Sequence, residues 1–203
     1  MKTDLNSNLK VWQLLICTFL ACCILYWFFG QHQFKTTDDV LKEASTMIER
    51  HEGKNHNVYD DSRSIPTIGI GFNLNSPYAK SRLKSIGVDY DHLLAGKSSL
   101  TKEQMYHLFY QDVQTAVDDA RKFLPSFDKQ PKEIRIVLID MSFNLGLTRL
   151  NQFVKFHKAL MDRDYLEASK EMIDSRWYRQ VGNRSKELVG IVRDLSQTVK
   201  ITS

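Results

Sequence analysis

Three side chains close together in the sequence could carry out acid–base chemistry on a substrate. Glu52 follows a stretch in which apolar residues recur at helical spacing. Asp61 comes nine residues later, and Thr67 follows on a strand that the sequence also predicts. An inverting glycosidase uses one carboxylic acid to protonate the leaving oxygen and a second carboxylate, across a cleft, to activate water. A hydroxyl such as that of Thr67 could hold the water. By spacing alone, two solvated surface carboxylates remain the alternative.

A zinc site is the competing interpretation of the same stretch. The helix of a zinc protease needs His-Glu-x-x-His, with the two histidines four residues apart on one helical face. Here His51 and His56 are five residues apart, and Gly53 interrupts the helix between them. We therefore expect both histidines on the surface and no zinc-protease helix here.

The spacing of apolar residues predicts the helix that positions Glu52. Ala44, Ile48 and Glu52 are four residues apart, so they share one helical face. Gly53 is a natural helix stop. A carboxyl held against apolar surface favours its protonated form, which suits a general acid.

A hairpin pattern follows, and it positions Asp61 and Thr67. We predict a first strand over residues 57–60, a turn at residues 62–64, and a return strand over residues 65–72. Thr67, Gly69 and Gly71 then share a nearly bare face, along which a bulky ligand could approach the backbone. The lone Gly-x-Gly lacks the third glycine of a dinucleotide-binding fingerprint.

The rest of the chain reads as helical. Thr101 and Gln104 fit a capping box that opens a helix to about residue 123, and Pro131 begins another that stops at Gly146. Further helices are predicted near residues 150–161, 165–174 and 184–195. The fold class is therefore α+β and mainly helical, with a small antiparallel sheet beside a helical bundle.

An uncharged apolar segment, residues 11–30, precedes this region. A helix of that length crosses about 30 Å of hydrocarbon. The positive charges before it predict a cytoplasmic N-terminus. We predict a cytoplasmic N-terminus over residues 1–10, a transmembrane signal-anchor over 11–30, a tether over 31–35, and one domain over 36–203. A cleaved signal peptide, a lipoprotein signal and a releasable anchor remain alternatives.

The segment from Glu52 to Phe72, EGKNHNVYDDSRSIPTIGIGF, resembles the active-site segment of phage-type lysozymes and endolysins (T-even phage-like lysozymes, glycoside hydrolase family 24). The shared pattern is Glu52-Gly53, Tyr59, Asp61 and the run from Thr67 to Gly71. Downstream, LTKEQMYHLFYQDVQTAV, LIDMSFNLG and SRWYRQVGNRSKELV also resemble helices of that family. The resemblance covers about residues 40–195 and implies a lysozyme-like fold.

The resemblance implies a role for each matched residue. Glu52 is expected to protonate the glycosidic oxygen, Asp61 to stabilise the developing positive charge and help activate water, and Thr67 to position that water. Arg184 matches a family arginine that pairs with the catalytic glutamate. Such a pair favours the ionised form of Glu52 and opposes the effect of burial, and the sequence leaves open which of the two prevails.

The family pattern also marks residues around the cleft. The expected substrate-binding residues are Phe143, Asn144, Asn73, Phe156 and Glu171. Core packing remains an equal alternative for Phe143. Tyr59, Gly69 and Gly71 are expected to shape the hairpin.

The implied function is that of a muramidase, and the resemblance implies no metal ion or other cofactor. It is expected to hydrolyse, with inversion, the β-1,4 bond between N-acetylmuramic acid and N-acetylglucosamine in peptidoglycan. The domain is expected to be monomeric, outside the cytoplasmic membrane and attached to it through residues 11–30. A net charge of only +4 argues against a nucleic-acid partner. The alternatives are a non-catalytic wall-binding module and an anchored interaction protein on the same fold.

Overall fold

The structure of the protein is a computed structural model that describes residues 39–61 and 64–202. The chain divides into two compact units, residues 1–42 and residues 43–203, and the fold below is that of the second. The predicted cytoplasmic segment, membrane anchor and tether, residues 1–35, lie outside the described residues. Within the described part, no helix is both long enough and apolar enough to cross a membrane.

A helix over residues 39–52 leads into a small antiparallel sheet. Ala44 and Ile48 are fully buried, as their spacing predicts, and the helix ends before Gly53, which has a positive φ of 71°. The described strands are β1 (Asn55–Asp60), β2 (Pro66–Gly69) and β3 (Phe72–Asn73), in the order β1-β2-β3.

The predicted return strand over residues 65–72 is wrong in its second half. The chain turns between β2 and β3 at Gly69 and Gly71, which have φ values of 69° and 72°. Side chains other than glycine rarely adopt such values, so the two glycines mark a turn within the run. Thr67 pairs with Tyr59 on one side and with Asn73 on the other, so it lies on the central strand.

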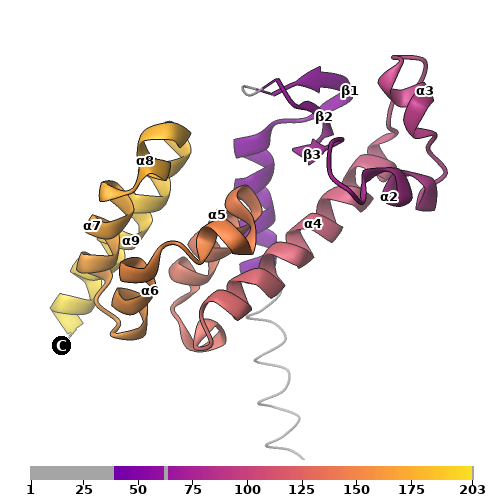
Figure 1. The fold of residues 1–203 in the computed structure, drawn as a ribbon. Helices are drawn as coiled ribbons and strands as arrows, with labels where there is room; N and C mark the ends of the chain where they lie inside the picture. The colour runs from indigo at the N-terminus through magenta and orange to yellow at the C-terminus, as the bar shows by residue number, and fades with distance from the viewer. Residues whose placement is uncertain (1–38, 62–63, 203) are drawn as a thin grey trace, which may run out of the picture. The chain divides into compact units, whose positions relative to one another are not determined.

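The long helix α4 (Lys102–Phe123) connects the two ends of this unit. Figure 1 shows the sheet, α2 (Ala79–Ser85) and α3 (Tyr90–Leu94) near the start of α4, and the later helices near its end. The predicted capping box at its start is confirmed. The Thr101 hydroxyl accepts from the Gln104 N–H, and the Gln104 side chain accepts from the Thr101 N–H.

The later helices form a bundle. They are α5 (Lys132–Leu150), α6 (Val154–Met161), α7 (Tyr165–Asp174), α8 (Arg176–Val181) and α9 (Asn183–Thr202), preceded by the short 3-10 helix η1 (Phe127–Lys129). Gly146, predicted as the end of the α5 helix, has φ 68° and ψ 162° and breaks the helix at that point. The helix α8 was not predicted.

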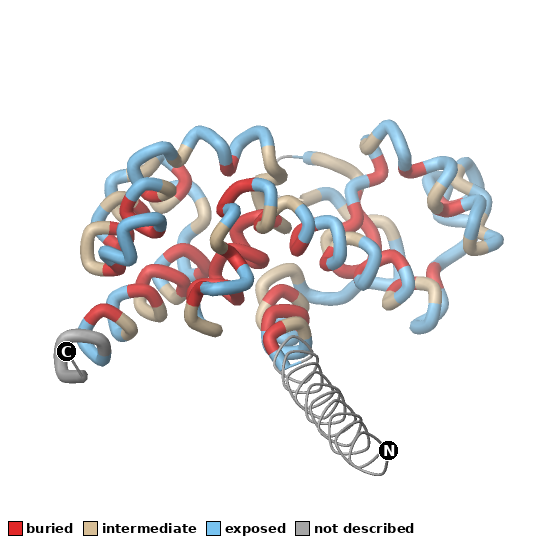
Figure 2. Tube along the Cα trace, turned by 90° about the horizontal axis from the view of Figure 1, so that it is seen from below, coloured by how far each residue is buried: buried red, intermediate tan, exposed pale blue. Residues whose placement is uncertain are grey.

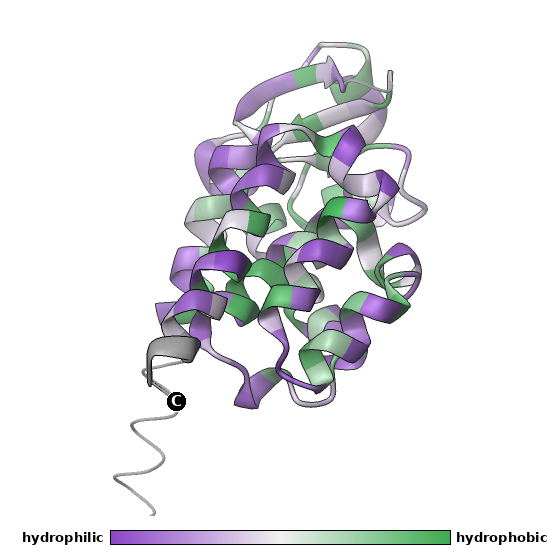
Figure 3. Cartoon of the chain, turned by 90° about the vertical axis from the view of Figure 1, so that its left-hand side faces the viewer, coloured by the Kyte–Doolittle hydropathy of each residue, from purple (hydrophilic) through white to green (hydrophobic). Residues whose placement is uncertain are grey.

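The core of the bundle lies along α5. Every residue from 134 to 142 is buried, and a helix buried on all sides is expected to be apolar all round. Figure 2 shows buried residues on the inner sides of the helices and exposed residues on their outer turns. In Figure 3 hydrophobic residues likewise lie between the helices, with hydrophilic residues facing outward. The predicted fold, mainly helical with a small antiparallel sheet, is confirmed for the described residues. Asp140 and Arg135 are charged exceptions within this core.

Candidate functional site

The carboxylate of Glu52 is held from two sides. Its Oε1 accepts a hydrogen bond from Nη1 of Arg184, at 2.5 Å, across 132 residues of sequence. Its Oε2 lies against Gly71, where an added Cβ would come within 2.8 Å of it. The Glu52 side chain keeps 22% of its surface exposed, while Arg184 keeps only 8%. Arg184 therefore orients the carboxyl, which still has surface open to a ligand.

Gly71 and Gly69 do not form the bare face that their alternation predicts. A Cβ on Gly69 would lie 3.3 Å from the Met105 side chain, so this position faces the core. The space beside Gly71 is taken by Glu52. The physical reason is the turn between β2 and β3, which separates the two glycines from the strand face of Thr67.

Asp61 and Thr67 lie together at the hairpin. One Asp61 carboxylate oxygen accepts from the Ile65 N–H at 2.9 Å, and the Thr67 hydroxyl donates to the Ile65 carbonyl at 2.9 Å. Burial raises the pKa of the Tyr59 phenol, and the negative charges of Glu52 and Asp61 raise it further. Both carboxylates therefore lie within electrostatic reach of one ring, which lies opposite Thr67 in the sheet.

Arg184, the partner of Glu52, also belongs to a network of buried ion pairs. Nε of Arg184 donates to Oδ1 of Asp140 at 2.6 Å, and Nδ1 of His51 lies 2.8 Å from Oδ2 of the same carboxylate. Nε2 of His51 lies 3.2 Å from Glu187. His51 was predicted on the surface, which is wrong, because its side chain is only 8% exposed. The described residues contain no group of His, Cys, Asp and Glu suited to hold a metal ion.

The carboxylates in this network raise the pKa values of two basic groups, Arg184 and His51. Burial lowers the pKa of Arg184, but Asp140 and Glu52 raise it by more, so it lies above its ordinary value. The hydrogen bond to Asp140 raises the pKa of His51, against the opposing effect of burial. The sequence offered one signal for Asp140, a single carboxylate inside the run IVLIDMSF, which has no other charged residue.

A small cavity of about 230 Å³ lies beside Gly71. Asn73 and Phe143, two of the predicted substrate-binding residues, line it. The Phe143 ring is partly exposed and packs edge-on against Phe109, with the ring centroids 5.9 Å apart. Phe143 therefore takes part both in packing and in the cavity wall, and its contact with substrate stays a prediction.

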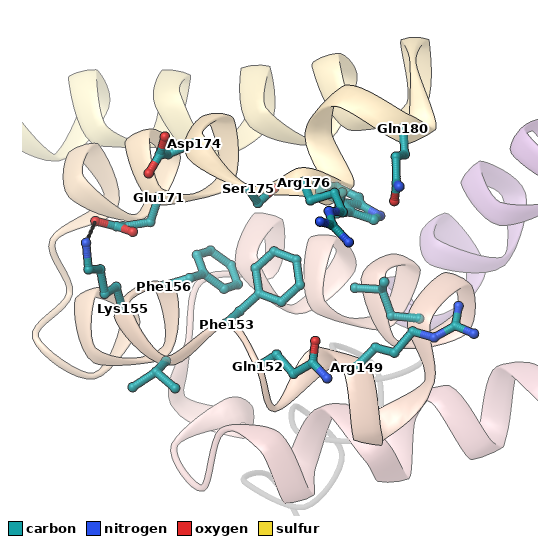
Figure 4. Close-up of a pocket in the computed structure, with 13 residues that line it drawn as sticks. Arg149, Gln152, Phe153, Lys155, Phe156, Glu171, Asp174, Ser175, Arg176 and Gln180 are labelled. Atoms are coloured by element: carbon teal, nitrogen blue, oxygen red, sulfur yellow. Dashed lines mark ion pairs between the residues drawn. The ribbon is translucent and has the colours of Figure 1, made fainter.

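A larger cavity of about 620 Å³ lies among the bundle helices, as Figure 4 shows. Glu171 lines it, with its carboxylate 3.8 Å from the Lys155 ammonium. Phe156 stacks on Phe123 and is 1% exposed, so its ring offers almost no surface to a sugar. Phe156 lines the same cavity from this packed position, and its contact with a sugar stays a prediction.

Asn144 is engaged with the bundle. Its side-chain oxygen accepts a hydrogen bond from the Trp177 indole N–H at 3.0 Å. Trp177 is 5% exposed and lines the larger cavity. The side-chain amide nitrogen of Asn144 has two N–H donors, so a polar contact with substrate stays a prediction.

Comparison with known proteins matches the described site to one family. The family Phage lysozyme matches residues 49–194. The pre-baseplate central spike protein Gp5 of Enterobacteria phage T4 is 25% identical over 79% of this chain, which spans only 29% of that protein. The probable T4-type lysozyme 1 of Dictyostelium discoideum is 25% identical over 75% of this chain and 95% of its own length.

A shorter match supports the same assignment. The peptidoglycan hydrolase gp36 of Enterobacteria phage SP6 is 26% identical over 54% of this chain and 11% of its own length. The family match runs from the helix turn before Glu52 into α9, beyond Arg184, so it includes every residue of the site described above. The chain therefore belongs to the phage lysozyme family of hydrolases.

Proposed function

We propose that the protein is a muramidase that hydrolyses the β-1,4 bond between N-acetylmuramic acid and N-acetylglucosamine in peptidoglycan, with inversion. The observation that carries the proposal is the placement of Glu52, which is hydrogen-bonded to Arg184 and lies beside Gly71, near the hairpin that carries Asp61 and Thr67. The names of two relatives, a lysozyme and a peptidoglycan hydrolase, support the substrate class.

The proposed mechanism uses Glu52 as the general acid. Its carboxyl proton passes to the glycosidic oxygen as the bond from that oxygen to the anomeric carbon breaks. Asp61 stabilises the positive charge that develops on the sugar and accepts a proton from the attacking water. The water enters from the face opposite the leaving group, which inverts the configuration.

Thr67 and Arg184 support this chemistry. The Thr67 hydroxyl donates its proton to the Ile65 carbonyl, so its lone pairs remain to accept a hydrogen bond from the water. After proton transfer Glu52 is an anion, and Arg184 lies within hydrogen-bond distance to stabilise that charge.

A membrane-anchored location fits this activity. The substrate of a peptidoglycan hydrolase lies outside the cytoplasmic membrane, and residues 11–30 carry no charge. We propose that these residues anchor the chain, with the lysozyme domain, residues 36–203, on the outer side as a monomer.

The test is hydrolysis of purified peptidoglycan by the full-length chain in a non-ionic detergent. We expect the parent to release new reducing ends and Glu52→Gln to lose roughly 100-fold or more of that rate, since the amide has no proton to give. Glu49→Gln is the matched control, because Glu49 lies on the same helix and contacts Lys54 and Tyr106 instead. NMR of the first product is expected to show the α-anomer.

Two results would contradict the proposal. A folded parent that releases no reducing ends from walls of several chemotypes would favour a wall-binding module. Hydrolysis that Glu52→Gln leaves intact would show a different catalytic acid.

A further inference from the structure

We propose that Asp140 and His51 are positioning residues, which set the direction of the Glu52 carboxyl through Arg184 and make its proton affinity depend on the charge of His51. This inference rests on the proposed function, because it concerns the residue proposed there as the general acid.

Asp140 holds the Arg184 guanidinium in a single orientation. Its Oδ1 accepts from Nε at 2.6 Å, and its backbone carbonyl accepts from Nη2 at 3.2 Å. The third nitrogen, Nη1, donates to Glu52. Because the guanidinium is planar and rigid, two bonds from one residue determine where the third nitrogen points.

The position of the carboxyl therefore depends on Asp140. On one side Arg184 fixes Oε1, and on the other the backbone at Gly71 limits Oε2. Asp140 has no exposed surface, so water does not compete for its carboxylate. Removing the charge of Asp140 is expected to let the Arg184 guanidinium adopt other orientations, and the Glu52 carboxyl would then lose its fixed partner.

The protonation state of His51 makes this arrangement depend on pH. Its two ring nitrogens each face a carboxylate, Asp140 from α5 and Glu187 from α9. A neutral imidazole has one N–H, so only the charged form can donate to both. Loss of the proton therefore removes one of the two hydrogen bonds and one positive charge from the network.

The charged groups that the described part of the chain places around His51 all affect its protonation. Asp140 comes from α5, Glu187 and Arg184 from α9, and Arg50 lies on the same helix as His51, where it pairs with Glu187 at 2.6 Å. When His51 is charged, its positive charge lies next to Asp140. This charge offsets part of the attraction between Asp140 and Arg184.

The direction of the effect on the acid follows from the signs of the charges. The positive charge of His51 favours the ionised form of Glu52. When His51 is neutral, Asp140 attracts Arg184 more strongly, which weakens the pull of Arg184 on Glu52 and favours the protonated carboxyl that a general acid needs.

An NMR titration of His51 in the full-length chain in detergent tests the coupling without turnover. Because linkage is reciprocal, removing the charge of Glu52 must change the proton affinity of His51 by the same free energy. We expect Glu52→Gln to lower the measured pKa of His51 by about half a pH unit, less than the effect of a direct neighbour. Asp162→Asn, at an exposed ion pair of α6, is expected to leave it unchanged.

Kinetics on peptidoglycan test the consequence. We expect Asp140→Asn to lower kcat by roughly 10- to 100-fold with KM within about twofold, as for a misplaced catalytic group. His51→Gln should move the alkaline limb of the pH–rate profile about half a unit upward. His107→Gln, on the exposed face of α4, is the matched control and should leave the profile unchanged.

The outcomes separate this inference from the proposed function. An unchanged His51 titration in Glu52→Gln overturns the coupling, whether or not the chain hydrolyses peptidoglycan. Parental kcat in folded Asp140→Asn overturns the positioning role. If Asp140→Asn does not fold, as near-UV circular dichroism would show, an unchanged pH profile in His51→Gln still overturns the pH dependence.

Discussion

At the scale of single residues, Gly71 combines two requirements at one position. Its φ of 72° favours glycine, and its missing side chain leaves room for the Glu52 carboxylate. We expect Gly71→Ala to lower kcat roughly 100-fold, because the new Cβ displaces Oε2 of the carboxylate whose other oxygen, Oε1, is bound by Arg184. The measurement is the initial rate of reducing-end release at saturating peptidoglycan.

Gly87 provides the matched control. It has a similar positive φ of 74°, but an added Cβ would meet no atom within 4 Å. Gly87→Ala should therefore introduce a similar backbone strain to Gly71→Ala, without the contact with Glu52 and without lowering kcat. Equal loss of kcat in the two variants would mean that backbone strain, and not contact with Glu52, explains the effect.

Residue positions near one another in sequence were predictable, whereas the buried network was not. Helical spacing predicts Glu52 on the buried side of its helix end, which needs only local information. The partners of Asp140, in contrast, lie 89 and 44 residues away, at His51 and Arg184. Only the fold brings these charges together, so a single sequence gives His51 no reason to be buried.

At the scale of secondary-structure elements, the capping box of α4 makes a prediction about stability. Thr101 and Gln104 satisfy each other's backbone N–H groups at the first turn. Thr101→Ala is expected to lower the free energy of unfolding by about 1 kcal/mol, or the thermal midpoint by about 2–4 °C. Activity below the transition should not change, since Thr101 is exposed and lies at the start of α4.

Thr101→Ser tests the mechanism of this loss. Serine keeps the hydroxyl that accepts the Gln104 N–H, so the thermal midpoint should stay near that of the parent. A serine variant as unstable as the alanine variant would assign the effect to the lost methyl group instead of the cap.

Element boundaries were predictable where the sequence carries a strong local signal. The cap at Thr101 and the break at Gly146 lie where the sequence places them. The six-residue helix α8 is too short for apolar periodicity to reveal. The return strand ends early at Gly69, because a run of alternating residues fits both one long strand and two short strands joined by glycines.

At the scale of the whole molecule, the anchor proposed over residues 11–30 makes a prediction about where the chain resides in a cell. Leu15 and Leu20 lie inside this uncharged segment. An arginine near the centre of a transmembrane helix costs about 3 kcal/mol, so the double variant Leu15→Arg/Leu20→Arg should fail to insert. We expect the parent in washed membranes and degraded by protease added to spheroplasts, and the double variant in the soluble fraction, protected from that protease.

The control and the rival locations give different results in the same experiment. Leu94→Arg adds a charge at an exposed leucine and should fractionate like the parent. A cleaved signal peptide would give a soluble exported chain whose mass lacks the N-terminal segment, whereas a parent protected inside the cell would contradict export altogether.

If the double variant keeps the parental rate on purified peptidoglycan while losing wall cleavage in cells, the site and the anchor act independently. The chemistry then depends on Glu52 and its partners, and access to the substrate depends on the first residues of the chain.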